Sequence, residues 1–233
     1  MPSGSVRMPT LLALDTSTEA CSCALAHAGE ISEKFAVIPR QHTNQLLPMI
    51  HALMSEGGLT FNQLDAIAFG KGPGSFTGLR IAAGVAQGIA FAANLPVVPV
   101  STLAALAVEA VDGGSGMVFS CLDARIDEIY YGWYQVQDGV PQLIGDEQLR
   151  RPELVETAVP VSDGNCIAAG NGLHYRDRLP RSLLQSFGSL RPELLPRSRH
   201  IAAIAAAMFA RGATVTAEQI EPVYLRDKVT HHQ

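Results

Sequence analysis

The fold class is decided by residues 66–100, which read AIAFGKGPGSFTGLRIAAGVAQGIAFAANLPVVPV. The apolar run at residues 66–69 has the length of a strand, and a glycine-rich turn follows it. Residues 76–94 then form a mostly apolar run of helical length, and residues 97–100 are again short and apolar. A strand, a helix and a second strand in this order are typical of an α/β sheet with crossover connections.

The residues before this stretch predict three strands and one helix. The continuous apolar run 11–14 has the character of a central strand that is buried on both faces. Short polar turns separate it from residues 21–27 and 31–38, which complete a three-stranded meander. Residues 43–56 carry apolar side chains at helical spacing, and Pro48 inside this helix predicts a late start or a kink.

The second half of the chain repeats the order of elements of the first half. Residues 117–122 predict a strand, an Asp-containing turn follows, and residues 128–136 and 142–149 predict the next two strands. We interpret this repeat as a loose internal duplication of one supersecondary unit. The sequence therefore predicts two lobes with related mixed sheets, residues 8–110 and residues 111–233.

The second lobe is predicted to end with an irregular stretch and a helix. Residues 180–199 contain several prolines and arginines, which favour an exposed connection. Residues 201–211 predict a helix, and this last helix is a candidate to pack back on the N-terminal lobe.

The composition excludes several classes of protein. Of the 233 residues, 47% are hydrophobic and 17% are charged, which provides for a core and excludes a disordered chain. The formal net charge of -5 and the lack of a strongly basic stretch argue against independent binding to nucleic acid. Any role on a nucleic acid would need a partner that supplies most of the positive surface.

Cysteine usage and hydropathy predict a cytoplasmic protein that does not cross a membrane. The four cysteines form no C-x-x-C pair, and the N-terminal residues do not read as a signal peptide. Reduced thiols are typical of the cytoplasm. Residues 81–108 carry no charge, but Asn94, Pro96 and Pro99 interrupt this run below the ~20 apolar residues that a bilayer needs.

Two acidic turns are candidate ligand-binding positions. Asp15, Thr16 and Ser17 follow the first buried strand, at the end of a strand where ligands collect in α/β sheets. Asp123 occupies the matching place in the second half of the chain. Together the two turns suggest a nucleotide cleft between the lobes, while an ordinary Asp/Ser/Thr turn remains the alternative for each of them.

A glycine-rich turn precedes the helix over residues 76–94. Gly72, Gly74 and Ser75 stand where exposed backbone N–H groups and the helix dipole favour an anion. The turn is not a Walker A loop, because no Lys-Ser or Lys-Thr pair follows its last glycine. A tight turn that lets helix and sheet approach closely explains the glycines equally well.

The helix that follows this turn is apolar on every side after Arg80. Such a helix must be covered on every side, and one sheet and one neighbouring helix leave part of it uncovered. Either a protein partner or the chain's own helix over residues 201–211 covers the remainder.

The sequence lacks the usual signatures of a catalyst. None of the seven histidines forms the i, i+4 pair that places two imidazoles on one helical face, so we predict no metal site. No G-x-S-x-G nucleophile elbow is present. We therefore predict no catalytic residue in this chain.

Five motifs together resemble the bacterial TsaB family, also called YeaZ, from about Met8 to Arg226. The motifs are Leu14–Thr18, His42–Pro48, Gly72–Arg80, Asp123–Tyr130 and Pro222–Arg226. The resemblance implies the actin/Hsp70-like ATPase (ribonuclease H-like) fold, with two lobes that have related mixed sheets. TsaB proteins are non-catalytic relatives of the catalytic subunit TsaD, whose metal-binding His-x-x-x-His corresponds here to Thr102 and Leu106. Neither residue can hold a transition metal as an imidazole does.

The resemblance also implies a function. By this resemblance, the chain is expected to be the accessory, non-catalytic subunit required for threonylcarbamoyl transfer to N6 of adenosine 37 in tRNAs that read codons beginning with A. In this family the subunit binds and positions TsaD as a heterodimer, the ATPase TsaE joins the assembly, and the subunit forms a homodimer when alone. The implied contact with tRNA is made only through the complex.

The resemblance carries two sets of residues onto this chain. The family's helical partner interface implies a role for Leu46, Leu47, Ile50, Met54, Ala82, Val85, Ala86 and Ile89. The remnant of an ancestral phosphate site corresponds to Asp15, Thr16, Ser17, Gly72, Gly74, Ser75 and Asp123. We expect no required cofactor and at most weak binding of ATP or ADP by the isolated chain.

Two other functions compete with this interpretation. The first is a stand-alone ATP-binding kinase or hydrolase of the actin-like superfamily that uses the cleft around Asp15, Gly74 and Asp123. Tight binding and turnover of Mg-ATP by the pure chain would favour it. The second is a peptidase, for which the sequence offers neither metal ligands nor a nucleophile–base pair.

Overall fold

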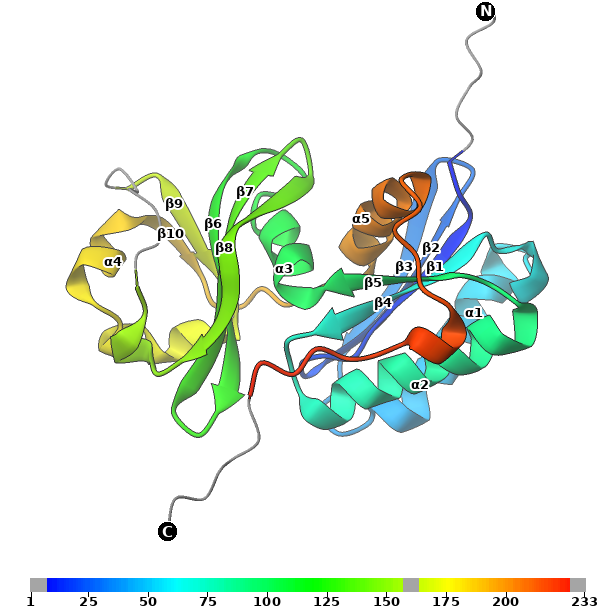
Figure 1. The fold of residues 1–233 in the computed structure, drawn as a ribbon, viewed down its shortest axis with the longest axis horizontal. Coiled ribbons are helices and arrows are strands. Elements are labelled where there is room, and N and C mark those ends of the chain that lie inside the picture. The colour runs from blue at the N-terminus through cyan, green and yellow to red at the C-terminus, as the bar shows by residue number, and fades with distance from the viewer. Residues whose placement is uncertain (1–7, 157–163, 227–233) are drawn as a thin grey trace, which may run out of the picture. The chain divides into compact units, whose positions relative to one another are not determined.

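The computed structural model describes residues 8–156 and 164–226, which form two compact units (Figure 1). The first unit comprises the residues up to Lys71, Thr77–Val100 and Arg197–Glu221. The second comprises Gly72–Phe76, Ser101–Pro196 and the residues from Pro222 onward. Residues 157–163 and 227–233 of the predicted second lobe lie outside the described residues.

The first unit is built on a mixed five-stranded sheet whose strands stand in the order β3-β2-β1-β4-β5. The strands are β1 (Leu11–Asp15), β2 (Ala20–His27), β3 (Glu30–Val37), β4 (Ala66–Gly72) and β5 (Val97–Ser101). β2 is antiparallel to both β1 and β3, and β4 is parallel to β1. Residues Leu11–Leu14 are wholly buried, which confirms the prediction of a central strand covered on both faces.

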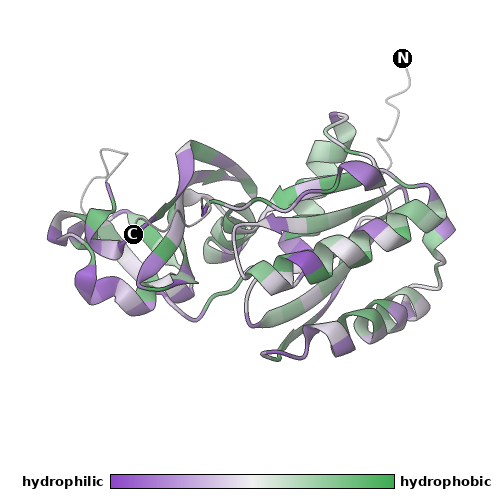
Figure 2. Ribbon diagram, turned by 60° about the horizontal axis from the view of Figure 1, so that its bottom comes forward, coloured by the Kyte–Doolittle hydropathy of each residue, from purple (hydrophilic) through white to green (hydrophobic). Residues whose placement is uncertain are grey.

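Helices cover both faces of this sheet, because the inner strands β1 and β4 are apolar at successive positions and buried on both faces. Leu12 and Leu14 belong to the core beneath α1 (His42–Glu56) and α2 (Phe76–Ala93), which lie on the same face (Figures 1 and 2). The opposite face is covered by α5 (Ser198–Ala210), which packs on β1, β2 and β3. The Ser198 backbone N–H donates to Ser22 Oγ over 3.1 Å and fastens the start of α5 to β2.

The second unit repeats this topology. Its strands are β6 (Gly116–Arg125), β7 (Glu128–Gln137), β8 (Val140–Arg150), β9 (Cys166–Ala169) and β10 (Phe187–Arg191), in the order β10-β9-β6-β7-β8. β7 is antiparallel to β6 and β8, and β9 is parallel to β6 and β10. Each sheet is thus an antiparallel meander extended by parallel strands, which confirms the predicted internal duplication.

The helix that follows the fifth strand of each sheet packs on the other sheet. α3 (Thr102–Ala110) comes after β5 but packs on β6, β7, β8 and β9. α5 comes after β10 and packs on the first sheet. Residues 101–110 therefore belong to the second unit and residues 197–221 to the first, so the observed division differs from the predicted boundary at residue 110.

Two local predictions are wrong. The supposed connection at residues 180–199 contains α4 (Arg181–Ser186), β10 and the start of α5. β10 has no alternating pattern of its own and owes its regular structure to backbone pairing with β9. Of the two alternatives expected at Pro48, a late start or a kink, the late start is wrong, because α1 begins at His42 and includes Pro48. The remaining elements are 3₁₀ helices at Phe61–Gln63, Pro152–Leu154, Asn171–Arg178 and Ala217–Gln219.

Among the described residues, α2 is the one helix long and apolar enough to pass as a membrane span by length and composition. Its buried residues lie against the first sheet or within the same unit: Gly78, Leu79, Ala82, Ala83, Ala86 and Ala90. The high apolar content of α2 is therefore explained in part by its position as a core helix.

The hairpin between β6 and β7 has an uncommon backbone. Arg125, Ile126 and Asp127 all have positive φ angles, of 63°, 54° and 59°. A β-branched side chain is disfavoured in this left-handed region, where glycine or asparagine is preferred. The Ile126 side chain is 78% exposed, so burial does not compensate for its backbone conformation.

We predict that Ile126→Asn raises the free energy of unfolding by ~1 kcal/mol, because asparagine tolerates the left-handed conformation. Urea unfolding followed by circular dichroism measures the change. Val140→Asn is the matched control, since Val140 is also exposed, at 54%, but is not among the residues with positive φ. The control should not be stabilised, and equal gains in both variants would contradict the assignment of strain to Ile126.

Candidate functional site

The first acidic turn is closed by its own hydrogen bonds. Asp15 Oδ1 accepts from the Ser17 backbone N–H over 3.1 Å and from Ser17 Oγ over 2.9 Å. Thr16 Oγ1 donates to the Gly78 carbonyl over 2.6 Å and ties the turn to the first turn of α2. All three residues of the turn, Asp15–Ser17, are buried.

Asp15 is a buried carboxyl group with an incomplete set of partners. Among the described residues, its Oδ2 has no hydrogen-bond partner. Burial raises the pKa of Asp15 from its ordinary value of 3.8 to about 7, against the lowering effect of the two hydrogen bonds from Ser17. The group therefore holds its proton up to near-neutral pH.

The glycine-rich turn belongs to the second unit. β4 ends at Gly72, which has a φ of +108° that favours glycine, and the Gly72–Pro73 peptide bond is cis. Gly72 and Pro73 are buried, Gly74 is half-buried and Ser75 is exposed. The Pro73 carbonyl accepts a hydrogen bond from Thr102 Oγ1 at the start of α3.

The second acidic turn is also closed by local contacts. Asp123 Oδ1 accepts from the Arg125 backbone N–H over 2.8 Å, and Oδ2 lies 3.1 Å from Arg125 Nη1. The Asp123 backbone N–H donates to Asn171 Oδ1 over 3.0 Å. The Arg226 guanidinium donates to the Ala124 carbonyl over 3.0 Å and pairs with Glu128 at 2.8 Å. Asp123 is therefore neutralised by groups of its own unit.

These two carboxyl groups do not fit the Mg²⁺ that nucleotides bring to an actin-like ATPase. Magnesium in proteins is held octahedrally by one or two carboxylates together with water molecules and substrate phosphates. Asp15 is buried and protonated up to near-neutral pH, and both oxygens of Asp123 already have partners. The predicted nucleotide cleft would need residues from both units. Within each unit, however, Asp15 and Asp123 make hydrogen bonds that stabilise their own turns.

The two positions at which the family resemblance implies the metal ligands of TsaD are filled by structural contacts. Thr102 is wholly buried and donates to the Pro73 carbonyl. Leu106 is wholly buried, and its side chain stands directly against Gly170, where an added Cβ would come within 2.7 Å of Leu106 Cδ2. No group of three or more His, Cys, Asp or Glu residues within residues 8–156 and 164–226 could hold a metal ion.

The structure corrects the residues predicted for a partner interface. Leu47 is 45% exposed, and Val85 and Ile89 are partly buried against the core of the first unit. The other five predicted residues are buried in the first unit: Leu46, Ile50, Met54, Ala82 and Ala86. These five residues stabilise the unit itself and offer no surface to a partner.

The outer face of α2 consists of different residues. Gly84, Gly88 and Phe91 are exposed, and the exposed fraction of Phe91 reaches 71%. A methyl group added at Gly84 or Gly88 would meet no heavy atom within 4 Å. The spacing of these residues along the helix places them on one stripe. The sequence contained this signal, because Gly84 and Gly88 lie opposite Ala82 and Ala86 on a helical wheel.

Two related units, each with an acidic turn at the end of its central strand, define a protein of the actin-like, ribonuclease H-like fold class. The family model described as "TsaD: tRNA N6-adenosine threonylcarbamoyltransferase" matches residues 31–228. A solved structure, "YeaZ from Pseudomonas aeruginosa", superimposes with a TM-score of 0.88 at 47% identity, and the match covers 94% of this chain and 100% of that chain.

Curated relatives narrow the assignment within this class. The tRNA threonylcarbamoyladenosine biosynthesis protein TsaB of Escherichia coli is 39% identical over 94% of this chain and 95% of its own length. The protein of the same name from Haemophilus influenzae is 39% identical over 95% of each chain. The chain belongs to the TsaD-related family and, within it, to the TsaB proteins of tRNA threonylcarbamoyladenosine biosynthesis.

Because burial raises the pKa of Asp15 to about 7 in the folded chain, while the unfolded chain releases this proton near pH 4, the contribution of Asp15 to the stability falls as the pH rises between these values. We predict that Asp15→Asn removes much of this dependence and raises the free energy of unfolding at pH 8 by ~2 kcal/mol. Urea unfolding at pH 4, 6 and 8 measures the effect. Asp146→Asn, at an exposed position, should leave the profile unchanged. An unaltered profile in Asp15→Asn would show that Asp15 is ionised in the folded protein.

Proposed function

We propose that this chain is the non-catalytic subunit that binds and positions TsaD during threonylcarbamoyl transfer to N6 of adenosine 37 in tRNAs that read codons beginning with A. The role in threonylcarbamoyladenosine biosynthesis follows from the family to which the chain belongs. The observation that carries the partner-binding part is the exposed glycine stripe on α2.

Gly84 and Gly88 reduce the stability of the isolated chain without an internal benefit. Glycine inside a helix costs ~1 kcal/mol relative to alanine. Elsewhere in the chain a glycine can be required by close packing, as at Gly170, where an added Cβ would come within 2.1 Å of the Cys121 carbonyl oxygen. Neither Gly84 nor Gly88 has such a neighbour. A helix of a partner protein that approaches α2 closely explains why these two positions are small.

Exposed and partly buried apolar side chains on α1 and α2 support an interface on this side of the first sheet. Phe91 on α2 and Leu47 on α1 are exposed, and Val85 and Ile89 are only partly buried. α1 and α2 lie on the same face of the first sheet (Figures 1 and 2). Exposed apolar groups gathered on neighbouring helices are typical of a protein-binding surface. In the absence of TsaD, the same surface would join two copies of this chain.

The accessory character of the subunit is supported by the positions that would carry catalysis. Thr102 and Leu106 replace the metal-binding histidines of TsaD and are packed inside the second unit. The engagement of Asp123 and the burial of Asp15 support at most weak binding of ATP or ADP, with no cofactor required by this chain. The catalytic metal and the reacting groups are then supplied by TsaD.

The remaining partners follow from the same proposal. TsaE joins the assembly of this subunit with TsaD, and tRNA is bound only through the complex. The formal net charge of -5 supports an indirect role towards tRNA, since a phosphate backbone is bound by clustered cations. A subunit that acts with these partners on tRNA works in the cytoplasm.

A drop-out assay tests the proposed function. Purified TsaD, TsaE and the enzyme that forms threonylcarbamoyl-adenylate receive tRNA, threonine, bicarbonate and ATP, with or without this chain. Formation of threonylcarbamoyladenosine only in its presence is the expected result. Equal product without the chain would contradict an accessory role, and ATP hydrolysis by the pure chain would favour the stand-alone ATPase.

We predict that Gly84→Ala and Gly88→Ala each raise the free energy of unfolding of the isolated chain by ~0.5–1 kcal/mol, because alanine favours the helix. Each variant should weaken TsaD binding about 5- to 150-fold, because overpacking a close contact costs ~1–3 kcal/mol and 1.4 kcal/mol corresponds to about tenfold. Urea unfolding and calorimetric titration with TsaD measure the two effects.

Ala203→Gly on α5 is the matched control, because Ala203 is exposed on a helix that covers the other face of the sheet. It should lower the stability of the chain and leave the affinity for TsaD unchanged. If the α2 variants are more stable and bind TsaD as tightly as the unaltered chain, the glycine stripe is not the interface.

A further inference from the structure

We propose that a pocket at the C-terminal end of α2 binds a basic side chain, an arginine or a lysine, of the protein that docks on the outer face of this helix. The inference rests on the proposed function, since it specifies a chemical contact within that interface. It assigns the role of counter-charge to Glu218.

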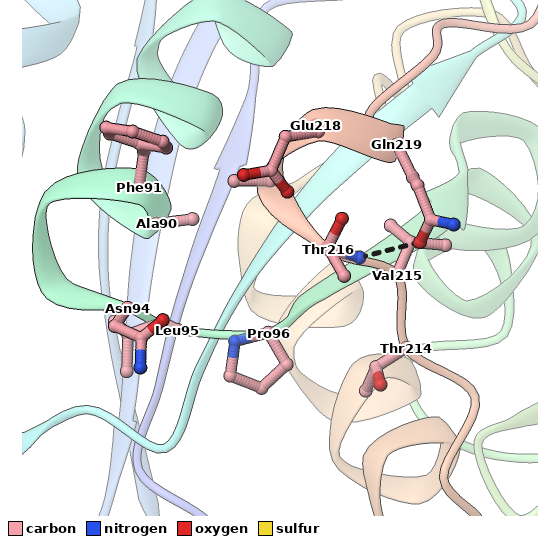
Figure 3. A pocket seen from close by; sticks show the side chains of 11 residues that line it. Ala90, Phe91, Asn94, Leu95, Pro96, Thr214, Val215, Thr216, Glu218 and Gln219 are labelled. Carbon is pink, nitrogen blue, oxygen red and sulfur yellow. Dashed lines mark hydrogen bonds between the residues drawn. The ribbon is translucent and has the colours of Figure 1, made fainter.

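The pocket lies entirely within the first unit and has a volume of about 520 Å³. One wall is the last turn of α2 with the loop that leads to β5, and the other wall is formed by residues 214–219 (Figure 3). Its polar lining includes Asn94, Thr214, Thr216 and Glu218. A cavity of this volume accommodates a long side chain together with neighbouring atoms of its backbone.

Both walls are fixed by contacts inside the chain, so the pocket is formed before any partner binds. Val97 and Val215 exchange two backbone hydrogen bonds of 2.9 and 2.8 Å, which attach residues 214–219 to β5. Gln87 Nε2 on α2 donates to the Ala217 carbonyl over 2.9 Å. Ala217 itself is buried in the core of the first unit. A preformed pocket keeps the entropic cost of binding low.

The electrostatics of the pocket favour a cation. The C-terminus of a helix carries a partial negative charge, and the last turn of α2 contains no basic residue. The exposed Glu218 carboxylate points across the pocket towards α2 (Figure 3). A hydrogen bond from the Thr216 side chain lowers the pKa of Glu218, so this group is ionised at neutral pH. No lysine or arginine within residues 8–156 and 164–226 lines the pocket.

The C-terminal end of α2 and the Glu218 carboxylate therefore both contribute negative charge to the pocket, and no described residue of the pocket lining supplies a cation. Opposite charges are normally favoured at a helix C-terminus, so a cation suits this position. A basic group supplied from outside would meet the carboxylate and the helix end together. A charge-assisted hydrogen bond of this kind is about twice as strong as a neutral one.

Phe91 adds a second feature that suits a long basic side chain. Its ring is 71% exposed at the edge of the pocket, where it can cover the methylene groups of a lysine or face a guanidinium. Phe91 follows Gly88 by three residues and therefore shares the face of the glycine stripe. A partner helix that lies along the stripe would bring a side chain to the pocket at the end of its contact.

The test is calorimetric titration of the full chain with purified TsaD at 50 and 300 mM NaCl. Glu218→Gln removes the charge and preserves the size of the side chain, and Glu221→Gln is the matched control at an exposed position outside the pocket. We expect Glu218→Gln to weaken binding about tenfold at low salt and to reduce the salt dependence of the affinity. The control should bind as the unaltered chain does, and both variants should retain its melting temperature.

The outcomes separate this inference from the proposed function. If TsaD binds the unaltered chain and Glu218→Gln equally well, the proposed pocket contact is wrong, while the proposed binding of TsaD by this chain is supported. If TsaD fails to bind the unaltered chain, both are wrong. If sedimentation shows that Glu218→Gln weakens self-association but leaves TsaD affinity intact, the occupant is a second copy and the inference is overturned. A loss confined to Glu218→Gln supports it.

Discussion

The burial of β1 on both faces is the constraint on which the first unit depends. Its apolar residues pair with β2 on one side and β4 on the other, and they separate the core under α1 and α2 from the core under α5. The strand ends at Asp15, and Thr16 fastens the following turn to α2. The position of α2, and with it the exposed glycine stripe, is therefore set by the end of this one strand.

The duplicated topology places an equivalent acidic turn in each unit. In each unit an acidic turn follows the central strand, and in each the carboxyl group now serves the turn itself. Thr102 and Leu106 make packing contacts that join α3 to neighbouring segments of the second unit. The outer face of α2 carries the proposed function.

The backbone also shows where this chain is less stable than its fold requires. Ile126 has a left-handed backbone conformation, and its exposed side chain gains no stabilisation from burial in a core. Gly84 and Gly88 destabilise a helix that has room for larger side chains at both positions. Both glycines lie on α2, and a partner that covers this helix would offset the cost at these two positions.

The sequence by itself determined the alternation of strands and helices, the duplication, the central burial of residues 11–14 and the absence of a histidine pair, because these depend on local periodicity and residue type. Only the tertiary structure decided which side of α2 is covered. Ala82 and Ala86 face the sheet while Gly84 and Gly88 face outward, because the angle at which a helix lies on a sheet depends on contacts between segments distant in the chain. Contacts between distant segments also decide three features that the sequence did not predict. These are β10, which owes its regular structure to pairing with β9, the placement of α3 on the second sheet, and the pocket that residues 214–219 form beside α2.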